Sequence, residues 1–377
     1  MAISSVSILR RAENIMTRFN LKSGDQLSPR TIPIWRIVQI LVWLAGAFIL
    51  FNLIFYPTVG IHLFWNVLIP VAPALLVIAV GAWRNICPMA STALFPRHMG
   101  LSKRKRLAFA QTGKLNLIAV IALLLIVPLR HAIFDMNGLA TAILIVSLVV
   151  VAVFAGSLFE WKSAWCSGLC PVHPVEKLYG INNRLSLLNA HCDECHRCVA
   201  PCPDTTPSIN PLSTKRTNYH RIAGLIMAGG FPGFVWGWFQ VPDYPGITGI
   251  EQLVFIYKLP ILGLLATIVL FLILRALFQE RILVSIFSAA AVSCYYWFRI
   301  PALFGFGIFP GDGMLIDLTG FLPEWSIRGA ICATTLFFFW WIVFSKQTRR
   351  SWEVRPALST ETGSDVPLVF RDHVLVP

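Results

Sequence analysis

The chain has 377 residues, of which 56% are hydrophobic and 13% charged, and its mean hydropathy is +0.69. This composition excludes an ordinary soluble globular protein. A net charge of +13 would suggest nucleic-acid binding in a soluble chain, but in a membrane protein it reflects basic cytoplasmic loops, so no nucleic-acid partner is expected.

Eight apolar runs predict an all-α polytopic membrane protein, because a helix needs about 20 apolar residues to cross a bilayer. The expected spans are 33–56, 61–83, 115–134, 138–160, 220–241, 252–278, 282–304 and 327–345. They divide the chain into a basic cytoplasmic segment 1–32, a membrane half 33–160, a cytoplasmic module 161–219, a second membrane half 220–345 and a cytoplasmic tail 346–377.

The charges of the connecting loops alternate along the chain. Lysine and arginine collect in the tails and the even-numbered loops, as in the run 103–106. The odd-numbered loops contain acidic residues such as Asp135, Asp243 and Asp317 but no lysine or arginine. Basic residues favour the cytoplasmic side, so both termini and the module 161–219 are expected to lie there.

Two Cys-Pro dipeptides follow even-numbered spans and form a weak internal repeat. Cys87-Pro88 follows span two, and the element Cys166-x3-Cys170-Pro171 follows span four. Aligned on Cys-Pro, Trp83 takes the place of Cys166. The repeat predicts two hairpins that each bring a cysteine to the same face of the membrane.

Several basic residues lie in or near the outer half of the spans, where ionisable groups are functional candidates. They predict a quinone or anion site at Arg130, His131, Lys258 and Arg299. The alternatives are that these side chains reach the outer headgroups, or that they pair with acidic residues of the outer loops. His62 and His131 lie at similar depth, but two histidines are weak evidence for haem, and no haem is expected.

The densest motif is the stretch 191–203, in which cysteines at 192, 195, 198 and 202 are followed by Pro203. This is C-x2-C-x2-C-x3-C-P, the bacterial ferredoxin run that holds a [4Fe–4S] cluster. Zinc sites more often use two separated C-x2-C pairs. The cytosol is reducing, so metal ligation is a better interpretation of these thiols than disulfides.

The sequence leaves the complete ligand set open. In one arrangement Cys192, Cys195 and Cys198 bind the main cluster with Cys170, following the ferredoxin crossover rule. Cys202 would then join Cys166 and Cys87 at a second centre with a histidine ligand. In the other arrangement Cys202 completes a single cluster within the run, and Cys87, Cys166 and Cys170 form a separate group of thiols at the membrane surface.

Through the run 192–203, the Cys166-x3-Cys170-Pro171 element and Cys87-Pro88, the chain resembles the membrane-bound polyferredoxins. That group includes ferredoxin-type proteins of periplasmic nitrate reductase systems, the iron–sulfur half of nitrous oxide reductase maturation regulators, and cytochrome oxidase accessory ferredoxins. The resemblance covers about 80–215. Here one ferredoxin run stands where the group commonly has two.

The resemblance implies a protein of the bacterial inner membrane with one or two [4Fe–4S] clusters. It implies electron transfer between the quinone pool, or a cytoplasmic donor, and a partner redox protein. One alternative is an assembly factor that reduces a metal or thiol for a partner metalloenzyme. Another is a transporter whose iron–sulfur module acts as a sensor.

Overall fold

The structure is a computed structural model that describes residues 30–105, 107–160, 162–182, 187, 190–191, 217–244 and 246–345. Within these ranges the chain is helical, apart from an isolated β-bridge between Lys105 and Phe159. The all-α prediction is therefore confirmed for this part of the chain.

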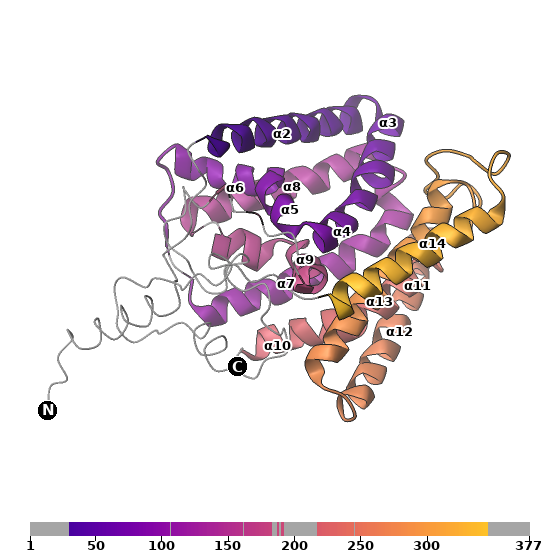
Figure 1. Cartoon of the computed structure of the whole chain (residues 1–377). Coiled ribbons are helices and arrows are strands. Elements are labelled where there is room, and N and C mark those ends of the chain that lie inside the picture. The colour runs from indigo at the N-terminus through magenta and orange to yellow at the C-terminus, as the bar shows by residue number, and fades with distance from the viewer. Residues whose placement is uncertain are drawn as a thin grey trace, which may run out of the picture.

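Helices of the first half (indigo to magenta in Figure 1) lie beside those of the second half (orange to yellow). The first half contains α2 (Thr31–Phe55), α3 (Pro57–Ile61), η1 (His62–Leu68), α4 (Ile69–Ile78), α5 (Val80–Ile86), α6 (Pro88–His98), α7 (Phe109–Leu129), η2 (Arg130–Phe134) and α8 (Gly138–Leu158). The connection to the second half contains η3 (Lys162–Leu169), α9 (His173–Tyr179) and η4 (Gly180–Asn182). The second half contains α10 (Asn218–Leu225), η5 (Ile226–Gly230), α11 (Phe231–Trp238), α12 (Gly249–Arg275), α13 (Glu280–Leu303), α14 (Glu324–Phe339) and η6 (Trp340–Phe344).

Seven helical segments of the described chain are long and apolar enough to cross a membrane, where the sequence predicts eight. They are Thr31–Phe55, Pro57–Ile78, Ala110–Phe134, Gly138–Leu158, Gly249–Arg275, Glu280–Leu303 and Glu324–Phe344. On α2, large apolar side chains such as Ile37 and Phe48 are each 59% exposed. A helix that is apolar on all sides yet exposes such residues suits a lipid environment.

The predicted span 220–241 is helical from Asn218 to Trp238 but is not among the seven, because its glycines and tryptophans add little hydropathy. A Cβ on Gly113, near the start of α7, would meet Thr217 and His220 just before and within α10. At the other end, His131 of η2 hydrogen-bonds to the carbonyl of Trp238. This segment therefore runs beside the candidate span Ala110–Phe134 for most of its length.

Small residues allow α11 to pack closely on α12. Gly229, Gly233 and Gly237 recur at intervals of four residues, and a Cβ on Gly233 would lie 1.9 Å from the carbonyl oxygen of Gly263. The Thr267 hydroxyl at this crossing donates to backbone carbonyls and accepts from the Gly233 amide at 3.3 Å. Such small-residue stripes are the usual way in which membrane helices approach closely.

A tyrosine from the second half completes the broken helix α4. Pro73 interrupts α4, and the Tyr296 hydroxyl of α13 lies in the gap. It accepts a hydrogen bond from the Ala74 amide at 2.8 Å and donates one to the Pro70 carbonyl at 2.6 Å. The hydroxyl thus bridges the donor and acceptor of one helical turn, and a neighbouring helix satisfies the interrupted backbone.

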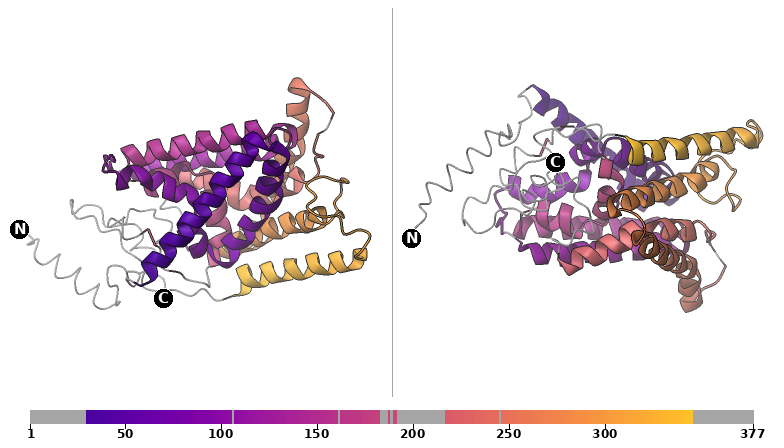
Figure 2. Two further views of the ribbon diagram at one scale, coloured as in Figure 1. Left: turned by 90° about the horizontal axis from the view of Figure 1, so that it is seen from above. Right: turned by 60° about the horizontal axis from the view of Figure 1, so that its bottom comes forward.

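The two views in Figure 2 show the long helices of both halves running between two ends of the molecule. The first end holds Cys87, which follows α5, and the short helices α9 and η4. At the opposite end lie the turns after α2, η2 and α11 and the loop 304–323. These are called below the inner end and the outer end.

Candidate functional site

The two Cys-Pro dipeptides have similar local geometry at the inner end. The Cys87 amide donates to the Trp83 carbonyl, and the Cys170 amide donates to the Trp165 carbonyl, both at 2.9 Å. After each dipeptide the chain turns back on its cysteine, with the Ala90 amide donating to the Cys87 carbonyl and the His173 amide to the Cys170 carbonyl, both at 3.1 Å. The two cysteines are therefore presented by similar backbone turns.

The structure gathers Cys87, Cys166 and Cys170 in one apolar cluster around the buried side chain of Trp165. Burial raises the pKa of the Cys87 thiol to about 11 and that of the Cys170 thiol to about 12. Both free thiols are therefore protonated at neutral pH. A metal centre would have to displace these protons on binding.

The three cysteines do not form a metal site alone. Within the described ranges no three His, Cys, Asp or Glu side chains come together in a group that could hold a metal ion. The ferredoxin run, with Cys192, Cys195, Cys198 and Cys202, lies outside the described residues.

The chain just before the run is tied to the helix that carries Cys87. The Ala190 amide donates to the Asn85 side-chain oxygen at 2.7 Å, and Asn85 is fully buried. The Asn85 carbonyl in turn accepts from the Gln39 side chain of α2 at 3.0 Å. Since Asn85 is two residues from Cys87, the described residue Ala190 lies beside the first Cys-Pro dipeptide.

Two ion pairs brace the same end. Arg84 of α5 pairs with Glu176 of α9 at 2.5 Å. This ion pair joins α5, which precedes Cys87, to α9, which follows Cys170. Arg97 of α6 pairs with Glu160 after α8 at 3.1 Å. Sequence reasoning did not identify Asn85 or Glu176, because their role depends on contacts about a hundred residues apart.

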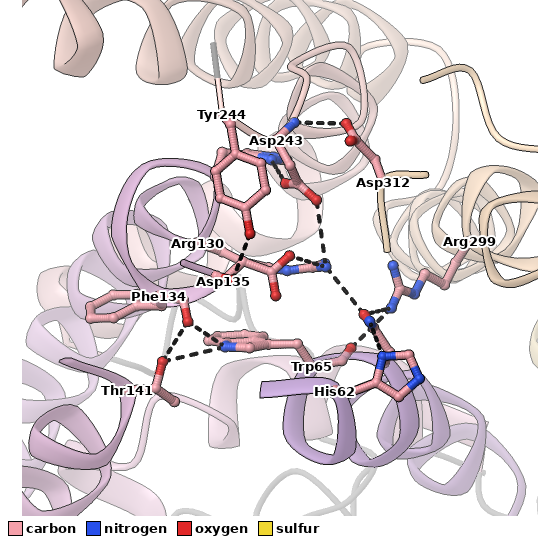
Figure 3. A network of polar contacts seen from close by, with 12 residues as sticks. His62, Trp65, Arg130, Phe134, Asp135, Thr141, Asp243, Tyr244, Arg299 and Asp312 are labelled. Carbon is pink, nitrogen blue, oxygen red and sulfur yellow. Dashed lines mark hydrogen bonds and ion pairs between the residues drawn. The ribbon is translucent and has the colours of Figure 1, made fainter. Parts of the chain in front are cut away.

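At the outer end the structure brings together three of the four basic residues predicted for a quinone or anion site. Arg130 and Arg299, both labelled in Figure 3, hydrogen-bond to one side chain, that of Asn66. Arg130 donates to its Oδ1 at 3.4 Å and Arg299 at 2.7 Å. His131 lies in the same network, whereas Lys258 is exposed and takes no part in it.

Acidic side chains accompany Arg130 in this network. Arg130 forms an ion pair with Asp135 at 3.0 Å and a longer one with Asp243 at 4.0 Å. Its guanidinium also lies between the rings of Trp65 and Trp238, 5.5 Å from the centre of each. Pairing with Asp135 and Asp243 was one alternative considered from the sequence.

The two carboxyl groups differ electrostatically. Burial raises the pKa of Asp135, and the opposing charge of Arg130 does not fully reverse this shift. Burial also acts on Asp243, but the hydrogen bond with His131 and the charge of Arg130 outweigh it and lower the pKa to about 2. Asp243 is therefore the firmly ionised member of the pair.

The histidines considered for haem are engaged elsewhere. His131 uses one ring nitrogen toward Asp243 at 2.5 Å and the other toward the Trp238 carbonyl at 3.1 Å. His131 therefore has no unengaged nitrogen for iron. His62 contacts the Asn66 side chain at 3.2 Å.

Sequence reasoning missed Asn66 and Trp238 at the outer end. The available signal for Asn66 was a polar amide within an apolar run, one helical turn after His62. Asp317, named as a possible partner, instead accepts from Thr319 within the outer loop.

Comparison with known proteins gives one limited likeness. A stretch of 62 residues is 39% identical to the methylamine utilization ferredoxin-type protein MauN of Paracoccus denitrificans (strain Pd 1222). The match covers 15% of this chain and 21% of MauN, so it extends over about a fifth of that relative. No protein-family model and no solved structure matches the chain. The likeness supports a ferredoxin-type relation for this stretch.

Proposed function

We propose that the chain is a membrane-bound iron–sulfur electron-transfer protein. Cys192, Cys195 and Cys198 would bind a [4Fe–4S] cluster, with Cys170 or Cys202 as the fourth ligand. The observation that carries this proposal is the hydrogen bond from Ala190 to Asn85, because it holds residue 190, two positions before the ferredoxin run, beside the helix that precedes Cys87. The ferredoxin-type name of the partial relative agrees with it.

When bound, the cluster would supply reversible one-electron transfer. The chain's own residues would set its properties. The apolar cluster around Trp165, in which Cys87, Cys166 and Cys170 lie, would limit access of water to the iron–sulfur cluster. Hydrogen bonds to sulfur and solvent exposure are the main influences of a protein on cluster potential.

The alternative of a thiol-reducing assembly factor is less well supported by the same geometry. A thiol reductant needs an accessible thiolate. Burial instead raises the pKa of Cys170 to about 12, and Cys87 lies in the same apolar cluster with its own pKa raised to about 11. Neither free thiol is therefore a thiolate at neutral pH, as thiol exchange would require.

A metal and sulfide analysis tests the proposed cofactor. We expect the purified protein to contain iron and acid-labile sulfide in equal amounts, and Cys195→Ser to lose most of both. Cys332→Ser is the matched control, because Cys332 is exposed on α14 and should leave both contents unchanged. Stoichiometric zinc without sulfide would refute the cluster.

The proposed location is the bacterial inner membrane, with both termini and the iron–sulfur module in the cytoplasm. The alternating loop charges support this orientation. If helix 218–238 crosses the membrane beside α7, the chain makes eight crossings and its ends lie on the same side.

Reporter fusions test this topology. We expect a reporter that is active only in the cytoplasm to work both before Met1 and after Pro377. Fusion within the loop 304–323 should silence it, which serves as the internal control. Activity at only one terminus would show seven crossings and reject helix 218–238 as a span.

A further inference from the structure

Three hydrogen-bond donors at the outer end have no acceptor within the described part of the chain. They are the Nε atoms of Arg130 and Arg299 and the indole Nε1 of Trp238. The three side chains are only 3%, 2% and 5% exposed. All three line one cavity of about 40 Å³. Each of these nitrogens can only donate, so each needs an acceptor that the described residues do not supply.

Arg299 also lacks a carboxylate partner in that part of the chain. Its terminal nitrogen donates to two neutral oxygens, the Trp65 carbonyl at 3.0 Å and Asn66 Oδ1 at 2.7 Å. Arg130 shares the same Asn66 oxygen. Two guanidinium groups therefore meet at one neutral amide, and a buried cation without a counter-charge is costly.

His131 also lines the cavity, but both of its ring nitrogens are engaged. One faces the Asp243 carboxylate and the other faces the Trp238 carbonyl.

The two carboxylates that line the cavity are already in use. Asp243 interacts with His131 and Arg130, and Asp312, which is half-buried, accepts the Asp243 backbone amide at 2.7 Å. Neither is within ion-pair distance of Arg299 in the described chain. Asp135 pairs with Arg130 but does not line the cavity.

The cavity volume limits what can enter. A single water needs about 10–15 Å³ by this measure, and an aromatic ring needs on the order of 150 Å³. A cavity of about 40 Å³ is thus too small for a quinone ring but large enough for a small ion. Gly313 of the outer loop packs against Arg299, because a Cβ there would lie 2.2 Å from a terminal nitrogen of that side chain.

We propose that this cavity binds a small monovalent inorganic anion, of the size of chloride, between Arg130, Arg299 and Trp238. The anion would accept from the three unpaired donors and would balance the charge of Arg299. This site is separate from the iron–sulfur module and lies at the opposite end of the molecule. Its test therefore does not depend on iron content.

Thermal unfolding of the full-length protein in detergent tests the site. We expect the unfolding midpoint to rise saturably with sodium chloride and not with sodium gluconate at the same ionic strength, since an anion bound only by the folded state stabilises it. Chloride-35 NMR line broadening by the protein should saturate over the same concentrations.

Variants locate the site. Asn66→Asp places a carboxylate between the two guanidinium groups, so it should raise the midpoint in gluconate and abolish the response to chloride. Trp238→Phe removes one donor and keeps most of the ring, and should weaken chloride binding about tenfold. Lys258→Gln, an exposed basic residue outside the network, is the control and should respond like the unaltered protein.

Equal responses of the unaltered protein to chloride and gluconate would overturn the proposal. So would an Asn66→Asp protein that folds and keeps the full chloride response. Binding of a short-chain quinone at the cavity without any effect of chloride would assign it to the quinone and likewise reject the anion.

Discussion

Replacing Cys170 by serine is expected to abolish or strongly perturb the main EPR signal of the dithionite-reduced protein, whereas Cys202→Ser should leave that signal in place. In ferredoxins the cysteine that precedes proline often serves a cluster other than that of its own run. Cys170 shares an apolar cluster with Cys87, and Asn85 ties Ala190 to the helix that carries Cys87.

The controls separate ligand loss from misfolding. Cys294→Ser on α13 should leave the spectrum unchanged, since Cys294 packs in the core of the membrane helices away from the inner thiols. The reverse pattern, in which Cys202→Ser destroys the signal and Cys170→Ser does not, would establish a self-contained loop cluster.

Gly233→Ala is expected to lower the free energy of unfolding of the helical part of the protein, and to lower it far more than Gly46→Ala does. The new Cβ would lie 1.9 Å from the Gly263 carbonyl oxygen, and both groups belong to helix backbones that cannot rotate away. Overpacking of this kind costs roughly 1–3 kcal/mol, and more where the backbone must move. The measurement is the unfolding midpoint in detergent, supported by the yield of monodisperse protein.

Gly46→Ala is the matched control for this substitution. Gly46 lies inside α2, and a Cβ there would meet nothing within 4 Å. Since alanine favours helices more than glycine does, this change should leave the midpoint unchanged or raise it slightly. Equal midpoints for the two variants would show that α11 and α12 separate easily.

Local sequence patterns predicted where the helices lie. They did not predict how 218–238 packs or where the helices become π-helical. Apolar runs predicted eight spans, and seven of them coincide with helices that are long and apolar enough to cross a membrane. The eighth, 220–241, is helical from Asn218 to Trp238, and its glycines allow close packing against α12. No pattern in the sequence predicted the π-helical segments His62–Leu68 and Arg130–Phe134. Both features arise from contacts between helices rather than from local preference.

The candidate sites were predictable where spacing or charge carries the signal. The Cys-Pro dipeptides identified Cys87 and Cys170 as candidate ligands. Charged residues within the predicted spans identified Arg130 and Arg299 as candidates for an anion or quinone site. The neutral residues that organise these groups, Asn85 and Asn66 above all, were not predictable. Their contacts join segments far apart in the sequence, which no local pattern encodes.

The hydroxyl of Tyr296 has a consequence for the order of events during synthesis. It completes the helical turn between Pro70 and Ala74, yet it lies 222 residues after Ala74. While the ribosome is still making the second half, the Pro70 carbonyl and the Ala74 amide have no such bridge, so the nascent α4 retains a weak joint in the bilayer. That joint becomes rigid only when α13 arrives. The Pro70–Ala74 turn of α4 therefore stays flexible until α13 packs against it, so this early helix reaches its final structure only after the late helix has been made.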